Sequence, residues 1–147
     1  MFMSEWNPQA GWAVFIGLVA AVEDLRRRQI PNWIPAVAVA GGIGIAAMDR
    51  GWAGVGSALA GTVAGFVVFF LFYALGAMGG GDVKLMAGFG AVLGWSLIWQ
   101  ASLWTAATGG LLALAVAGVS AIRGSRVDSI PYAPAIAAGC WLALIPK

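Results

Sequence analysis

The sequence contains no histidine and only one cysteine, Cys140, among its 147 residues. Without histidine, catalysis by Ser/His or Cys/His pairs and zinc sites of the HExxH type are excluded. A single cysteine excludes a disulfide within the chain and a cysteine-rich zinc module. We interpret Cys140 as a packing residue, because it lies in an apolar segment.

Charge is also scarce. Only 10% of the residues are charged and 61% are hydrophobic, with a mean hydropathy of +0.90, whereas soluble domains carry roughly 25% charged residues. We therefore expect an all-α integral membrane protein, a single domain over residues 1–147 whose core forms where helices pack against each other in lipid. The net charge of +2 is too small to indicate nucleic acid as a partner.

The apolar segments predict a bundle of about six short transmembrane helices. The first segment is followed by three arginines and has no basic region ahead of it, so we expect it to be retained rather than removed as a secretory signal. Asp49 to Gly51 and Gly94 to Ser96 are interpreted as turns. The predicted spans cover residues 10–24, 33–48, 52–77, 83–97, 99–122 and 131–145.

Glycine is abundant, and two pairs have the GxxxG spacing that lets helices approach closely. Gly61 with Gly65 forms one pair and Gly76 with Gly80 forms the other. We interpret both pairs as packing contacts.

The basic residues predict the topology, because cytoplasmic loops collect lysine and arginine. Six of the eight lie in the first, third and fifth predicted loops; Arg50 and Lys147 lie on the other side. The N terminus is therefore predicted outside and the odd-numbered loops in the cytoplasm. Five tryptophans then fall near the outer ends of the spans: Trp6, Trp52, Trp95, Trp99 and Trp141.

Two carboxylates stand at matching depth on the predicted cytoplasmic side. Asp24 ends the first span, and Asp82 follows a run of three glycines at the start of the fourth. Ionised carboxylates are costly in a bilayer, so polar residues at this depth are functional candidates. Two simpler interpretations remain open: Asp24 belongs to a solvated helix end together with Glu23, and Asp82 only caps its helix.

If the two helix ends touch, repulsion between the carboxylates holds one protonated and leaves the other ionised. The ionised group can take a proton from a water molecule that attacks a peptide carbonyl. The protonated group can stabilise the oxyanion and then protonate the leaving amine. Such chemistry requires no metal, cofactor or nucleophilic side chain.

Asp24 followed by Ile30-Pro31-Asn32, and then Gly79-Gly80-Gly81-Asp82-Val83-Lys84, resembles the type IV prepilin peptidases, membrane aspartic proteases of the GxGD type. The resemblance covers nearly the whole chain and implies that Asp24 and Asp82 are the catalytic pair. It also implies that Gly79 and Gly81 supply the glycines of GxGD. Ile30 to Asn32 would be a structural part of the first cytoplasmic loop, and Ile130 to Pro134 is similar to the element that opens the family's last helix.

The family cleaves the basic leader from prepilins and pseudopilins at the cytoplasmic face of the inner membrane, while the hydrophobic helix of the substrate stays in the membrane. Many members also carry a four-cysteine zinc region and methylate the new N terminus. This chain has neither that region nor its cysteines and resembles the short form associated with tight-adherence (Flp) pili. The resemblance therefore implies peptidase activity and leaves methylation open.

Two neighbouring charges have alternative roles. Glu23 either meets basic residues of the leader or pairs with Arg27. Lys84 moderates the charge of Asp82, binds a lipid phosphate or, in the simplest interpretation, anchors its helix at the interface.

Two other functions are compatible with the same residues. In a small transporter or a pilus assembly subunit, Asp24 and Asp82 would relay protons or cations. A purely structural pilus component would tolerate the loss of both aspartates.

Overall fold

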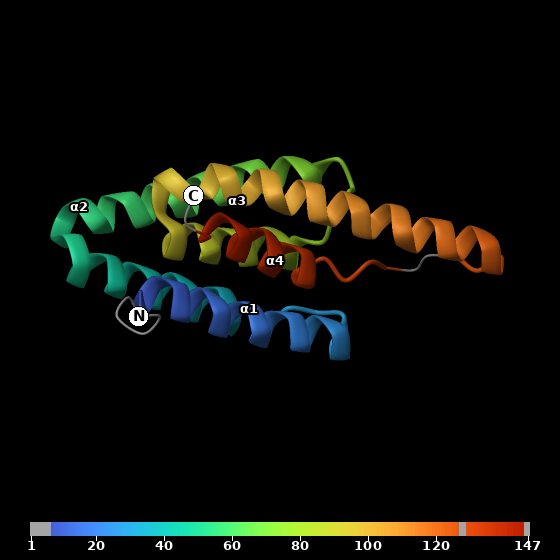
Figure 1. Ribbon diagram of the computed structural model, residues 1–147, viewed down its shortest axis with the longest axis horizontal. Coiled ribbons are helices and arrows are strands. Elements are labelled where there is room, and N and C mark those ends of the chain that lie inside the picture. Colours follow the sequence, from blue (N-terminus) through green and yellow to red (C-terminus); the bar gives the residue numbers. More distant parts are fainter. Residues whose placement is uncertain (1–6, 127–128, 146–147) are drawn as a thin grey trace.

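The computed structural model describes residues 7–126 and 129–145, and this part of the chain is all-α, as expected. It contains four helices, two of them very long (Figure 1). Trp6 and Lys147, which the sequence analysis placed near the outer ends of the spans, lie outside the described residues. The helices are α1 (Pro8–Arg27), α2 (Trp33–Ala74), α3 (Gly80–Arg123) and α4 (Ala133–Ala143).

Each of the long helices is broken at one glycine. Gly51 in α2 has φ 59° and ψ −139°, and Gly94 in α3 has φ 71° and ψ 179°. L-residues with a side chain rarely adopt such positive φ values, whereas glycine does so readily. Figure 1 shows that the chain folds back at both breaks, so each long helix forms two antiparallel arms. Both breaks fall in the turns expected at Asp49 to Gly51 and Gly94 to Ser96.

Instead of the six separate helices that the sequence predicts, the described residues form four helices, two of which consist of two arms. The arms cover residues 33–50, 52–74, 80–93 and 95–123. Residues 75–77 of the expected third span lie after the end of α2, and the largest shift is at residues 94–97, where Gly94 ends the first arm of α3. Both α2 and α3 are long and apolar enough to cross a membrane.

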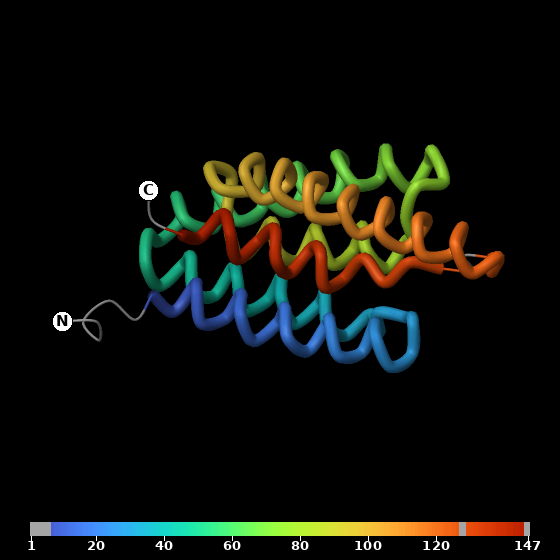
Figure 2. The backbone as a smooth tube through the Cα atoms, turned by 45° about the vertical axis from the view of Figure 1, so that its right-hand side comes forward, coloured from blue at the N-terminus to red at the C-terminus, as the bar shows by residue number. Residues whose placement is uncertain are grey.

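The breaks and the loops between helices lie at opposite ends of the bundle. In Figures 1 and 2 the connections at residues 28–32 and 75–79, the end of α3 and the start of α4 lie at one end, and the folds at Gly51 and Gly94 lie at the other. The last turn of α1 and the first turn of α3 therefore meet at the same end. This arrangement brings Asp24 and Asp82 together, although they are far apart in sequence.

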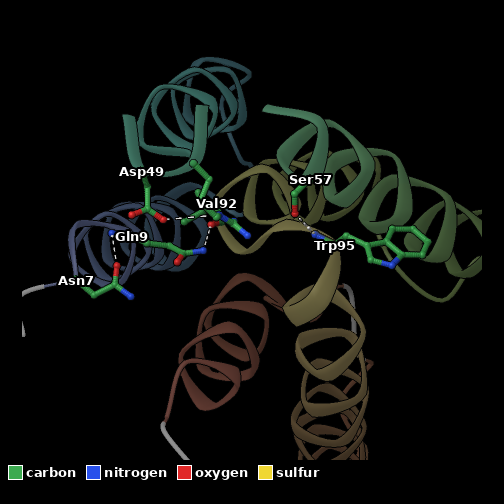
Figure 3. A network of polar contacts seen from close by, with 7 residues as sticks. Asn7, Gln9, Asp49, Ser57, Val92 and Trp95 are labelled. Carbon is green, nitrogen blue, oxygen red and sulfur yellow. Dashed lines mark hydrogen bonds and ion pairs between the residues drawn. The ribbon is translucent and has the colours of Figure 1, made fainter. Parts of the chain in front are cut away.

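The break at Gly94 leaves backbone groups that side chains of other helices satisfy (Figure 3). The amide of Gln9, in α1, donates to the carbonyl oxygen of Val92. The N–H of Trp95 donates to the hydroxyl oxygen of Ser57, in α2, over 3.1 Å. Because unpaired polar backbone groups are costly in an apolar core, these two contacts fix where α3 bends.

A very close helix contact lies between the second arm of α2 and the first arm of α3. A Cβ atom added at Gly61 would collide with the carbonyl oxygen of Gly90, and one added at Gly65 would come within 2.7 Å of the carbonyl oxygen of Met86. The packing role of the Gly61 and Gly65 pair is thus confirmed. Cys140 is fully buried in the core and is free, in agreement with its interpretation as a packing residue.

The second glycine pair does not form a helix contact. Gly76 has φ 75° and no neighbouring atom within 4 Å of an added Cβ atom, because it lies in the turn after α2. The interpretation of Gly76 and Gly80 as a packing pair was wrong, since it required one continuous helix through both residues.

Candidate functional site: two aspartates at one end of the bundle

Asp24 lies in the last turn of α1, and its side chain is directed into the protein. It is 6% exposed, which excludes a solvated helix end. Its Oδ2 atom accepts a hydrogen bond of 3.0 Å from the backbone N–H of Ala133, the first residue of α4. The helix ends just beyond it at Arg28, whose left-handed φ of 52° turns the chain away. The contact with Ala133 therefore ties the end of α1 to the start of α4.

Asp82 lies in the first turn of α3 and is 8% exposed. Its Oδ2 atom accepts a hydrogen bond of 3.3 Å from the backbone N–H of Gly79. The expected capping role is therefore present, and a carboxylate at this position also favours the positive end of the helix dipole. Capping engages one oxygen, so the carboxylate retains a second oxygen for other contacts.

The two carboxylates line the same space. Asp24 and Asp82 both border a cavity of about 320 Å³ and an adjoining cavity of about 390 Å³. They are near enough for the negative charge of Asp24 to act on Asp82. The expected pairing of these two residues at one end of the bundle is thus present in the geometry, and their catalytic role remains a hypothesis.

The Ile30 to Asn32 segment and the glycine run support this site by contacting each other. A Cβ atom added at Gly81 would come within 3.3 Å of the Ile30 side chain. Lys84 donates a hydrogen bond of 3.0 Å from Nζ to the side-chain oxygen of Asn32. The first loop is therefore held against the start of α3, with Pro31 between the two contacts.

The three consecutive glycines before Asp82 do not form a left-handed turn. Gly79 has φ −80°, and Gly80 and Gly81 belong to α3, whereas the left-handed residue of this connection is Gly76. Gly81 has a different use, since it leaves room for Ile30. The sequence alone could not separate these two uses of glycine.

Glu23 forms an ion pair with Arg27, four residues further along α1, at 3.4 Å. Neither of the two cavities that hold the carboxylates is lined by Glu23. The alternative contact with a substrate leader stays a prediction.

Arg28 is a site residue that the sequence did not single out. It lines both cavities of the aspartate pair, and its charge acts on Asp24. Its guanidinium donates a hydrogen bond of 3.0 Å to the hydroxyl oxygen of Ser129, in the connection before α4. Ile130, Pro131 and Tyr132 of the same connection also line the larger cavity. The only sequence feature that could have indicated a role for Arg28 is its position two residues before Ile30-Pro31-Asn32.

On the hypothesis that the aspartate pair cleaves a prepilin leader, as the resemblance implies, we expect Arg28→Gln to reduce the cleavage rate about tenfold, because displacement of reacting groups by small distances has large effects on rate. The substitution removes the cation beside Asp24, and the shorter glutamine side chain loses the hydrogen bond to Ser129. The measurement is the initial rate of leader release by purified protein. Arg26→Gln is the matched control, since Arg26 lies outside both cavities, and equal rates for the two variants would contradict a role for Arg28.

The fold and the site together define a class: a helical protein with two helices long and apolar enough to cross a membrane, and a buried pair of aspartates at one end. The sequence matches the model of the type IV leader peptidase family over residues 12–114, a range that includes both aspartates. The chain belongs to this family, which is membrane-bound. The resemblance noted in the sequence is therefore confirmed.

A curated relative agrees with this assignment. The chain is 36% identical over 141 residues to a prepilin leader peptidase/N-methyltransferase of Bacillus subtilis (strain 168), an alignment that covers 90% of this chain and 54% of the relative. The chain thus spans about half the length of the curated relative it matches. No solved structure matches the chain.

Proposed function

We propose that the chain is an aspartic endopeptidase that removes the leader peptide of type IV prepilins or pseudopilins, in particular those of Flp-like pili. The observation that carries the proposal is the pair of buried carboxylates, from the ends of two different helices, that line one cavity. Membership in the leader peptidase family supports the same substrate class.

In the proposed reaction one carboxyl group is protonated and the other is ionised, because two adjacent carboxylates repel each other. The ionised group takes a proton from water while the water oxygen bonds to the carbonyl carbon of the scissile peptide. The protonated group donates a hydrogen bond to the oxyanion and then gives its proton to the leaving nitrogen as the C–N bond breaks. Each aspartate has one oxygen that accepts a backbone N–H, which holds the carboxyl groups in fixed orientations.

The proposed topology places the aspartate pair at the cytoplasmic face of the inner membrane. Arg26 to Arg28, Lys84, Arg123 and Arg126 lie in or next to the connections at the aspartate end of the bundle, and Arg50 adjoins the break at the other end. An excess of basic residues at one end favours a cytoplasmic position for that end. We propose six membrane crossings: one for α1, one for each arm of α2 and α3, and one for the segment of residues 131–145 that contains α4.

Leader release in detergent tests the proposal. Purified protein is mixed with a candidate Flp-type prepilin, and the products are identified by mass spectrometry. A new N terminus at a single position supports an endopeptidase, whereas an intact prepilin under conditions in which the protein stays folded would refute it. A transporter or assembly subunit that uses the aspartates as a relay would leave the prepilin intact.

A basic leader also provides a test of Glu23. We expect Glu23→Lys to reduce cleavage of a leader rich in lysine a few-fold and to leave a leader with neutral residues unaffected, because exposed charge pairs contribute modestly. The ratio of kcat/KM for the two leaders is the quantity to measure. If the ratio does not change, the leader does not contact Glu23 and the pair with Arg27 is its whole role.

A further inference from the structure

An apolar groove lies beside the cavities of the aspartate pair. It has a volume of about 180 Å³. Its walls come from the second arm of α2, the second arm of α3 and α4, and the residues that matter here are Phe69, Phe72, Gly109, Gly110, Ala113 and Ile136. The α3 wall is made of small residues, which allow another chain to approach the helix backbone closely.

The groove continues into the larger cavity that holds the two aspartates. Ala77, Met78 and Tyr132 line both spaces. An occupant of the groove therefore has a direct path to the carboxyl groups of Asp24 and Asp82.

The lining changes character along this path. On the far side of the aspartates, the smaller cavity is bordered by the polar side chains of Gln29, Asn32 and Lys84. Along this path the smaller, polar cavity comes first, the aspartate pair follows, and the apolar groove comes last. A molecule that fills all of it is polar at one end and apolar at the other, with its reacting bond at the boundary.

We propose that the apolar groove binds the hydrophobic segment of the same polypeptide whose peptide bond is cleaved between Asp24 and Asp82. This inference rests on the proposed function, since it names the surface that holds the substrate during cleavage. A lipid chain would fill the groove but would bring no peptide bond to the aspartates. The hydrophobic segment of a substrate would fill the groove and would also place a peptide bond of the same chain next to them. Phe72 and Gly110, which line the groove, are themselves exposed, so the groove can be reached from the lipid.

The proposal can be tested by filling the groove at Gly110. An added Cβ atom at Gly110 has no neighbour within 4 Å, so a side chain can begin there without moving the backbone. Gly118 lies on the same arm, has the same open surroundings and is not part of the groove. G118L is therefore the matched control for G110L.

Two substrates separate binding in the groove from catalysis: a prepilin with its hydrophobic segment, and a short soluble peptide that ends soon after the cleavage site. We expect G110L to raise KM for the prepilin about tenfold or more, because one extra methylene already changes the fit of an apolar site by this order. Cleavage of the soluble peptide should be unchanged, and G118L should behave as the unsubstituted protein with both substrates. Equal effects of G110L on both substrates, or no effect on the prepilin, would overturn the proposal.

Cross-linking distinguishes a failure of this inference from a failure of the proposed function. A photoreactive residue at position 110 or 118 is illuminated with the prepilin in vesicles of phosphatidylethanolamine and phosphatidylglycerol, whether or not cleavage occurs. We expect position 110, but not position 118, to become linked to the hydrophobic segment of the prepilin. Links from position 110 to lipid alone, or to no molecule, would overturn the groove assignment even if the leader is released.

Discussion

Replacing Asp82 with asparagine is expected to lower the rate of leader release by about 10³-fold or more, and Asp24→Asn should have the same effect. Asparagine has nearly the same shape as aspartate but neither accepts nor donates the proton that the proposed reaction moves. The measurement is single-turnover cleavage of a prepilin by purified protein in detergent.

These substitutions should leave the fold intact for a structural reason. Each aspartate uses one carboxyl oxygen to accept a backbone N–H, from Ala133 or from Gly79. The amide oxygen of asparagine can accept the same hydrogen bond. The loss of activity should therefore occur without a change in helix content or thermal stability, which circular dichroism can verify.

Asp49→Asn provides the matched control. Asp49 has a 73% exposed side chain, pairs with Arg50 and lies beside the break at the opposite end of the bundle. Its replacement should leave cleavage unchanged. Normal cleavage by either Asp24→Asn or Asp82→Asn would refute the assignment of the catalytic pair.

Gly61→Ala is expected to destabilise the protein by about 3 kcal/mol, because an overpacked helix contact must separate to admit even one methyl group. The added Cβ atom would collide with the carbonyl oxygen of Gly90 and would lie 2.8 Å from the carbonyl carbon of Gly94. Both neighbours are backbone atoms, so no side chain can rotate to make room. The measurement is the midpoint of unfolding in one detergent, followed by circular dichroism.

Gly56→Ala is the control for this prediction. Gly56 lies on the same arm of α2, and an added Cβ atom there meets no atom within 4 Å. Alanine should be neutral or slightly stabilising at this position, since glycine is a poor residue inside helices. If Gly61→Ala and Gly56→Ala had equal stability, the close contact of α2 with α3 would not contribute to folding.

The broad architecture could be predicted from the sequence because its signals are local. The break at Gly51 is marked by two charges and a glycine between apolar segments, and Gly94 starts a similar interruption. The aspartates were identifiable because a carboxylate at the end of an apolar segment is unusual. These features depend on composition within a few residues.

Other features depend on contacts between distant residues, and the sequence carries no direct record of them. The hydrogen bond from Ala133 to Asp24 and the link from Arg28 to Ser129 both join the end of α1 to the approach to α4. Glycine was ambiguous for a different reason. Every glycine permits a left-handed turn, but Gly76 adopts one while Gly81 instead makes room for Ile30.

The second arm of α3 is too long for an upright crossing. Residues 95–123 form a helix of about 43 Å, whereas the hydrocarbon layer is about 30 Å thick. Figure 1 shows the surplus at the end where the aspartates lie, beyond the other helices. This overhang would keep the final turns above the lipid, in contact with water and with the phosphate headgroups.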